Sequence, residues 1–318
     1  MISIKRYTPA DAPVWDAFVR TARNATFLFE RAYMDYHSDR FTDHSLLCYN
    51  DKGALVAVLP ANEADGALWS HQGLTYGGLL VAPKVVSADV LTALQAIVDY
   101  ARSAGFRTLH YKPMPHIYHR APAQDDLYAL WRMGAQVEVC NLSAVIDLHA
   151  DPALHRPEYC RRNMFGRLQR EGYTVDWEVP LAEFWPILTD NLQQRYGASP
   201  VHTLDEMQRL QKAFPDQILC CVVRSPEGVA LGGTVLYETG QVVHTQYSSA
   251  SEQGKRCSAL DYLYGSLLRV YAMEEEVRYF DFGTSNEDAG RTLNASLIHY
   301  KESLGGRGVV YQTYFLAL

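Results

Sequence analysis

The sequence predicts an α/β (α+β) protein of two domains, each with a mixed central β-sheet flanked by helices. The length of 318 residues suits about two domains of ordinary size. The order of elements predicted in residues 1–150 repeats in outline in residues 151–318, and these two ranges are the predicted domains. The composition, 48% hydrophobic and 20% charged, is typical of a globular protein and excludes collagen, coiled coil and global disorder.

Hydrophobic periodicity and turn residues define the elements of the first predicted domain. Apolar residues at helical spacing follow Pro9 and Asp11, which open the first helix. Turn signals at 50–53 and 63–66 predict that the three strands around them form an antiparallel meander. The predicted strands are 2–7, 45–50, 55–61, 67–70, 107–112 and 135–148, and the predicted helices are 9–23, 87–104 and 124–133.

The second predicted domain follows a hinge-like stretch at 151–157 and has a similar order. Its meander has turns at 226–228 and 239–240, where Pro, Gly and Thr residues gather. The predicted strands are 173–179, 217–224, 229–238, 241–248, 277–282 and 309–316, and the predicted helices are 158–171, 181–196, 204–214, 259–273 and 292–304.

Two motifs near the C-terminus carry a family resemblance. A strand ends in Asp281-Phe282-Gly283-Thr284-Ser285, and the next helix ends in Tyr300-Lys301-Glu302-Ser303-Leu304-Gly305-Gly306. With the repeated element order, this pattern resembles the tandem GNAT proteins of the Fem peptidoglycan aminoacyltransferases and the related acyltransferases encoded with polysaccharide-synthesis genes. The resemblance implies two GNAT-like domains in tandem, the first on the acceptor side and the second on the acyl-donor side. It also implies a slot for the donor where two central strands splay apart.

The resemblance further implies transfer of an acyl group from acyl-CoA, expected to be acetyl-CoA, to an amine of a sugar or cell-envelope precursor. An alkyl ammonium has a pKa of about 10.4, so a base or a desolvating pocket must help to form the free amine. Tyr247, at the end of the predicted splayed strand, is the expected contact of the thioester. Tyr300 or His71 is expected to assist the proton transfer.

The segment Gln253-Gly254-Lys255-Arg256-Cys257-Ser258 aligns with the GNAT turn Q/R-x-x-G-x-G/A, which binds the cofactor pyrophosphate through backbone N–H groups. Gln253, Gly254, Lys255, Arg256 and Ser258 are therefore the expected cofactor contacts. The segment departs from the pattern at both glycine positions, where Arg256 and Cys257-Ser258 stand instead. Ser258 and Asp261 also form a possible capping box, which would occupy the same N–H groups.

A basic helix at 158–171 is the second possible anion site. Arg161, Arg162, Arg167 and Arg170 cluster on it in a protein whose formal charge is −7. Arginine forks match phosphate oxygens, so the helix could hold a phosphorylated substrate. The alternative is an ordinary solvated helix face.

The glycine-rich loop 70–78 could wrap a small polar ligand and present His71 and Tyr76 to it. The aromatic-rich stretch 27–40 could line the same cleft. The alternative for both segments is ordinary packing, with His71 a hydrogen-bonded structural residue.

Asp281 stands in a largely apolar strand and needs a polar partner. Helical periodicity puts Lys301 at the edge of the apolar stripe of the following helix, so an ion pair between the two is expected. Substrate contact or a catalytic role of these residues is the alternative.

The remaining features limit the choice of function. The sequence has no serine-hydrolase elbow, Walker loop, zinc-protease motif or dinucleotide fingerprint, and His116 and His119 have no convincing companions, so no metal is expected. The acidic balance disfavours nucleic acid as a partner. The expected acceptor is a small molecule or a nucleotide-linked sugar. We expect no membrane span and a cytoplasmic location. The sequence leaves the oligomeric state open.

Two alternatives to acyl-CoA chemistry stay open. The first is Fem-like aminoacyl transfer from charged tRNA, where a ribose hydroxyl leaves and a general acid is more necessary. The second is a degenerate GNAT scaffold that binds a glycan or a protein without chemistry, which the altered pyrophosphate turn supports.

Overall fold

The computed structural model describes residues 1–318, with the exception of the Tyr196 side chain at the end of one helix. The chain forms two compact units. Unit 1 comprises Met1–Leu142, Asn286–Thr292 and Val310–Leu318, and unit 2 comprises Ser143–Ser285 and Leu293–Val309. The strands β9 (Gln136–Asp147) and β17 (Arg307–Ala317) therefore contribute residues to both units.

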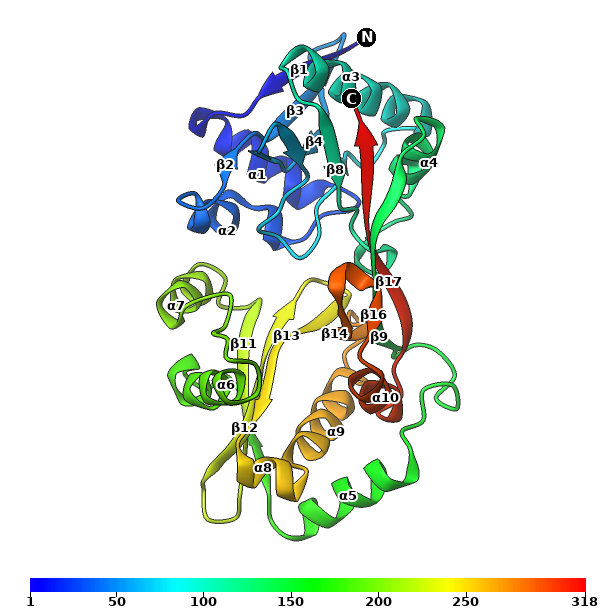
Figure 1. Ribbon diagram of the computed structural model, residues 1–318. Coiled ribbons are helices and arrows are strands. Elements are labelled where there is room, and N and C mark those ends of the chain that lie inside the picture. The colour runs from blue at the N-terminus through cyan, green and yellow to red at the C-terminus, as the bar shows by residue number, and fades with distance from the viewer. The chain divides into compact units, whose positions relative to one another are not determined.

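Unit 1 combines two groups of strands with helices (Figure 1). The first is an antiparallel sheet of order β1 (Ile2–Arg6), β3 (Leu46–Asn50), β4 (Leu55–Leu59) and β7 (Leu80–Val81). The second runs from the end of β17 through β8 (Thr108–Tyr111), β6 (Ala67–Trp69) and β5 (Asn62–Ala64) to β2 (Thr42–Asp43). The helices are α1 (Ala12–Thr21), α2 (Arg31–Met34), α3 (Ser87–Ser103) and α4 (Asp125–Arg132).

The core of unit 1 forms where the apolar stripe of α3 packs on both strand groups. Val90, Leu94 and Ile97 of α3 are each 1% exposed and share one cluster with Leu46 and Leu109. The spacing of these helix residues is the one that the sequence predicts for a core-facing side. Burial of this stripe supplies the main stabilisation of the unit.

The predicted meander of unit 1 is wrong at its third strand. The sequence predicts one strand over 55–61 that pairs with 67–70. In the structure, β4 ends at Leu59 and pairs with β3 and β7, whereas the separate strand β5 pairs with β6. Pro60 stands between β4 and β5, and because proline has no N–H to donate to a ladder, a central strand ends there.

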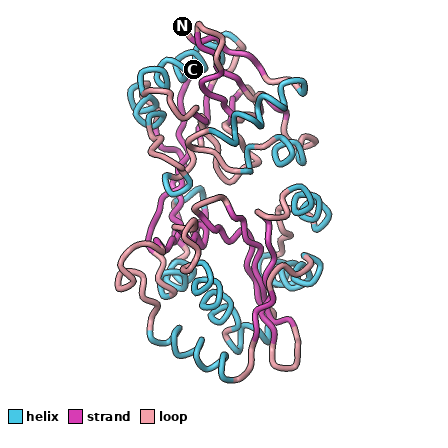
Figure 2. The backbone as a smooth tube through the Cα atoms, turned by 180° about the vertical axis from the view of Figure 1, so that it is seen from behind, coloured by secondary structure: helices cyan, strands magenta, loops and turns pink.

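Unit 2 contains a mixed sheet with helices on opposite faces (Figures 1 and 2). The strand order is β10 (Thr174–Asp176), β11 (Ile218–Arg224), β12 (Ala230–Glu238), β13 (Val242–Ala250), β14 (Tyr279–Thr284) and then the end of β9. The pair β13–β14 is parallel, and the neighbouring pairs are antiparallel.

The helices of unit 2 agree with the predicted positions within a few residues, except for the helix at Glu252–Cys257, where a turn is predicted. One face of the sheet carries α6 (Leu181–Tyr196) with α7 (Leu204–Ala213) beside it, and the other face carries α9 (Ala259–Tyr271) (Figure 1). The remaining helices are α5 (Tyr159–Arg170), α8 (Glu252–Cys257) and α10 (Ala295–Ser303), and two short strands, β15 (Asn286–Glu287) and β16 (Thr292–Leu293), pair with each other. Together α8 and α9 form the crossover that a parallel strand pair requires.

Candidate active site in the second unit

The central strands β13 and β14 of unit 2 separate soon after they meet. They pair over three positions, from Val242–Tyr279 to His244–Asp281, and both strands then continue without further mutual pairing among the described residues. A bulge at Gln246 bends β13, because Val235 of β12 pairs with Tyr247 and the next residue pairs with Thr245. The separation that the family resemblance implies is therefore present.

A cluster of three polar residues, His244, Asp281 and Ser143, lies where the two strands part, and we call it the fork site. The Asp281 carboxylate is 0% exposed and lies 3.0 Å from Nδ1 of His244. It also accepts hydrogen bonds from the Ser143 hydroxyl and, at 2.9 Å, from the Gly283 N–H. The side chain of His244 keeps 12% of its surface exposed, so it is the member of the cluster that solvent or a ligand can reach.

This arrangement fixes the chemistry of His244. An ionised carboxylate only accepts hydrogen bonds, so Nδ1 of His244 carries the proton and Nε2 is left with a free lone pair. An imidazole held in this tautomer by a buried carboxylate is suited to accept a proton from a nucleophile.

Sequence reasoning missed His244, because its contact with Asp281 depends on the register of a parallel strand pair. The available signal was the alternation of side chains in the strand predicted at 241–248. That strand neighbours the one that ends in Asp281.

Lys301 reaches the same end of β14 from α10. Its ammonium donates to the carbonyl oxygens of Gly283 and Thr284, each at 2.8 Å. Burial lowers the pKa of Lys301 to about 8, and the charge of Asp281 opposes this effect. The predicted partnership with Asp281 therefore acts through charge, while the hydrogen bonds of the two residues go to other groups.

Tyr247 follows the bulge in β13 and points toward α6. Its hydroxyl lies 2.6 Å from Nδ1 of His202 and accepts the His202 backbone N–H at 3.3 Å. The ring of Trp185 packs edge-on against it at 5.7 Å, and burial raises the pKa of the Tyr247 hydroxyl. Contact of Tyr247 with a thioester stays a prediction, since its hydroxyl is already engaged.

The expected pyrophosphate turn is a closed helix in the structure. The residues from Glu252 to Cys257 form α8, and its cap Ser251 accepts the Gly254 N–H at 3.1 Å. The Lys255 N–H is bonded to the Ser251 carbonyl, and the Lys255 ammonium pairs with Glu252 at 2.6 Å. Gln253 and Arg256 are exposed on the same helix. An open backbone cradle is absent from this described segment.

The expected capping box of Ser258 and Asp261 is wrong. Ser258 adopts a left-handed conformation, with φ of 62°, and its side chain makes no capping hydrogen bond. Asp261 is 4% exposed and instead accepts from Arg161 at 3.0 Å and from the Tyr300 hydroxyl at 3.0 Å. Because Asp261 is buried, its charge needs these partners, and loss of the cation would leave it uncompensated.

This contact changes how the basic helix is interpreted. Arg161 is used inside the protein, where it also donates to Ser303 and lies over the Tyr300 ring. Arg162 and Arg167 are exposed, and they contact the Pro157 carbonyl and Glu171. Of the four arginines predicted to hold a phosphate, Arg161 is therefore engaged, and Arg162, Arg167 and Arg170 remain exposed. Burial, and after it the charge of the neighbouring Asp261, raises the pKa of Tyr300 well above its usual value, so Tyr300 stays protonated and is no proton acceptor.

The two predicted site residues of unit 1, His71 and Tyr76, are buried. Burial is the main cause that lowers the pKa of His71 to about 3, which makes it a weak base, and the structure does not support it as the proton acceptor. Tyr76 is 2% exposed, and its hydroxyl lies 3.2 Å from the Thr26 hydroxyl. The structure does bring His71 together with the aromatic-rich stretch 27–40, through His37.

The described residues offer no metal-binding cluster and no membrane-spanning helix. In the described part of the chain, no three histidine, cysteine or carboxylate side chains lie close enough together to hold a metal ion. Of the described helices, none has the length and apolar character needed to cross a membrane.

Comparison with known proteins shows what this geometry is similar to. Residues 160–302, which include the fork between β13 and β14, match the model of the acetyltransferase (GNAT) domain. The segment that contains the fork therefore resembles a GNAT domain. No curated protein matches the chain in sequence.

Solved structures resemble the chain over its whole length. FemX gives a TM-score of 0.68 at 13% identity, covering 99% of this chain and 97% of that chain. L-PGS from Bacillus licheniformis gives 0.62 at 15% identity, covering 98% and 92%. A tandem GNAT protein from the clavulanic acid biosynthesis pathway gives 0.54 at 14% identity, covering 100% and 98%. Identities this low show the fold alone, and they confirm the predicted fold class of two GNAT-like domains in tandem.

Proposed function

We propose that the protein is an N-acyltransferase that moves an acyl group from an activated donor to an amine at the fork between β13 and β14. The observation that carries this proposal is the fork site: a buried carboxylate orients a partly exposed imidazole at the point where the central strands of a GNAT-type domain part. A base is the group that the reaction needs most, because only about one alkylamine molecule in a thousand is unprotonated at neutral pH.

In the proposed reaction, the amine nitrogen attacks the carbonyl carbon of the donor and forms the new C–N bond. Nε2 of His244 accepts the proton that the nitrogen loses, and Asp281 stabilises the resulting imidazolium. The bond from the carbonyl carbon to the leaving group then breaks. The leaving thiolate or alkoxide takes the proton back from His244, so that the enzyme returns to its starting state.

Two features support stabilisation of the negative oxygen that forms in this reaction. Beyond His244 the edge of β13 has no strand partner on the β14 side among the described residues, so its backbone N–H groups are available to a ligand. Lys301 has three N–H donors, and its two hydrogen bonds to carbonyl oxygens leave one for an oxyanion near the end of β14.

For the donor we propose acyl-CoA, with acetyl-CoA as the simplest case, and for the acceptor an amine of a small molecule such as a sugar or cell-envelope precursor. The match to an acetyltransferase domain supports this choice. A cytoplasmic location belongs to the same proposal.

One observation favours a second candidate donor, an aminoacyl-tRNA. The closed helix α8 occupies the place where a pyrophosphate would be bound, so the donor would have to be held by other groups. A tRNA ester needs no pyrophosphate contact at this position.

A donor panel tests both candidates. Acetyl-CoA, longer acyl-CoA esters and aminoacyl-tRNA are each added to the protein, and unfolding and amine acylation are measured. A ligand at a hundred times its dissociation constant adds about 2.7 kcal/mol of stability. Stabilisation and turnover with an acyl-CoA support the first donor, and the same with aminoacyl-tRNA supports the second. Absence of both effects with every donor contradicts the proposed function and favours a binding scaffold.

A further inference from the structure

Unit 1 contains a buried pair of histidines that the proposed function does not use, and we call it the histidine pair. The rings of His37 and His71 stack at 5.2 Å with an angle of 13° between their planes. They are 1% and 3% exposed. Phe41 packs edge-on against both rings, at 4.9 and 5.5 Å.

The polar atoms of His37 have no partner. Both ring nitrogens are buried, and neither makes a hydrogen bond in the described structure. The Gly73 backbone lies close enough to influence the pKa of His37, but it is not in hydrogen-bond geometry. A side-chain carbon on Gly73 would lie 2.4 Å from Nε2 of His37, so only glycine allows the loop to cover the ring. Buried polar atoms of this kind normally have a partner, so the two nitrogens of His37 are groups that a polar ligand could engage.

A lysine without a carboxylate lies beside the histidine pair. Lys112 is tied to the loop 70–78 at three points: its N–H donates to the Ser70 hydroxyl, its carbonyl accepts from Gly77, and its ammonium donates to the Leu74 carbonyl at 2.5 Å. In the described part of the chain, its ammonium has no ion-pair partner. Its charge is close enough to His71 to lower the pKa of that ring, together with burial, His37 and Arg31.

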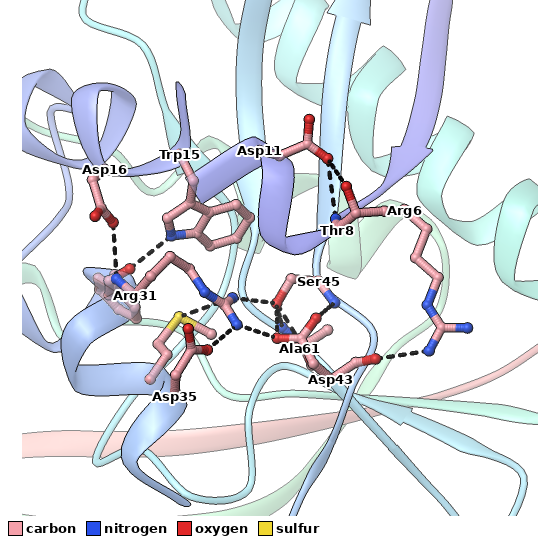
Figure 3. Close-up of polar contacts among 12 residues, drawn as sticks. Arg6, Thr8, Asp11, Trp15, Asp16, Arg31, Asp35, Asp43, Ser45 and Ala61 are labelled. Carbon is pink, nitrogen blue, oxygen red and sulfur yellow. Dashed lines mark hydrogen bonds and ion pairs between the residues drawn. The ribbon is translucent and has the colours of Figure 1, made fainter. Parts of the chain in front are cut away.

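The other nearby cation, Arg31, is fully compensated (Figure 3). Its guanidinium donates to Asp35, to Asp43 at 2.9 Å and to the Ser45 hydroxyl, and it lies 3.9 Å from the centre of the Tyr7 ring. Arg31 therefore adds positive potential to the region, while Asp35 and Asp43 balance its charge. Its buried Nε has no hydrogen-bond partner among the described residues. The charges of Asp35 and Asp39 raise the pKa of His37, and the charge of Arg40 lowers it. Neither carboxylate is among the groups that shift the pKa of His71.

We propose that His37, His71 and Lys112 form a binding site for an oxyanion, the phosphate or carboxylate group of a small-molecule ligand, beneath the loop 70–78. The site offers an ammonium with unused N–H groups and two imidazoles, one of which has both nitrogens free. An anion supplies the negative charge that Lys112 lacks and the acceptor that His37 lacks. Gly73 is the part of the loop that lies against His37, and its N–H donates to Nδ1 of His71 at 3.1 Å. This proposal does not depend on the activity proposed for unit 2.

The test is a titration of the full-length protein with inorganic phosphate and, separately, with acetate, followed by NMR of ¹⁵N-labelled histidine side chains. The expected result is a saturable shift of the His37 and His71 signals with at least one anion. Phosphate alone indicates a phosphorylated ligand, and acetate alone indicates a carboxylate. Absence of a shift with both anions overturns the proposal.

Variants separate this site from general surface binding. Lys112→Gln is expected to weaken the anion at least tenfold, whereas the exposed control Lys84→Gln leaves its affinity unchanged. His37→Leu removes the two unpartnered nitrogens, so it is expected to fold well and also to weaken binding tenfold. It serves as the test if Lys112→Gln fails to fold. Affinity equal to wild type in a folded His37→Leu or Lys112→Gln variant contradicts the proposal.

Discussion

The fork site of unit 2 and the histidine pair of unit 1 use the same side chain in opposite surroundings. His244 has a buried carboxylate at 3.0 Å and keeps part of its surface exposed. His37 and His71 are almost completely buried, and the nearby charges that act on His71 are positive. The first imidazole is held in one tautomer and can exchange a proton. The second and third are kept neutral, because burial and positive neighbours lower their pKa values.

The role of each of these histidines follows from its partner and from its exposure. The loop around His71 has the glycines of a ligand-binding segment, yet its ring is a poor base. His244 lies in a strand without any ligand-binding motif, yet the carboxylate beside its Nδ1 gives it the surroundings of a general base. The partner carboxylate decides between the two roles, and the following changes test that conclusion.

Replacement of the fork histidine should have the largest effect. His244→Gln is expected to lower the rate of amine acylation by about 10²- to 10⁴-fold, because a general base is lost. The matched control is His299→Gln, on the exposed face of α10, which should leave the rate within about twofold of wild type. The measurement is kcat/KM with the best donor from the panel. Equal rates for the two variants would show that the fork histidine is not the base.

A second pair of variants sharpens the comparison with a cation that does have a buried partner. Arg161→Gln leaves Asp261 buried without its cation, and we expect the free energy of unfolding to fall by about 3 kcal/mol. Arg162→Gln, on the same helix but exposed, should change it by less than about 0.5 kcal/mol. Urea denaturation of both variants provides the measurement, and equal stabilities would contradict the structural role of Arg161.

Asp281→Asn turns the fork histidine into one without a carboxylate, like the histidine pair. The amide cannot accept from Ser143, His244 and Gly283 as the carboxylate does, so we expect a loss of about 1–3 kcal/mol in stability. Asp99→Asn, at a side chain that is 61% exposed, is the control and should be neutral. A melting curve of Asp281→Asn that matches wild type would remove Asp281 as the anchor of the site.

The unpaired lysine of unit 1 should show itself in the pH dependence of stability. Burial lowers the pKa of Lys112 from 10.5 to about 8. Between these pH values the unfolded chain binds a proton that the folded chain does not, so stability rises with pH, at most by about 1.4 kcal/mol per pH unit. Compared with Lys112→Met, the wild-type protein should therefore gain stability from pH 8 to 10.5. Parallel stability curves for the two proteins would show that burial does not lower the pKa of Lys112 in the folded protein.

Much of this fold could be predicted from the sequence, and the reasons differ between elements. The α3 stripe and the strands of unit 2 carry clear periodicity, and the separation of β13 and β14 follows from the family resemblance. The break at Pro60 could also be predicted, because a proline interrupts the apolar run over 55–61 that otherwise suggests one longer strand. The closing of 252–257 into α8 was signalled by the missing small residues, since side chains at these positions suit a helix better than an open turn.

The fork site itself was beyond the sequence. The contact between His244 and Asp281 joins positions 37 residues apart and depends on a parallel register that the α8–α9 crossover sets. Helical periodicity correctly brought Lys301 close to the end of β14, but it could not tell a carbonyl partner from a carboxylate. The use of Asp261 by Arg161 was hidden for the same reason, because two helices distant in sequence supply the partners.

The pH dependence of acyl transfer tests the role of His244 most directly. The pKa of His244 is first measured in the wild-type protein by NMR of labelled histidine. If His244 is the base, kcat/KM for amine acylation falls on the acidic side with this same pKa, and the His244→Gln variant loses this acidic limb. An acidic limb that does not follow the His244 titration, or that persists unchanged in His244→Gln, would contradict it.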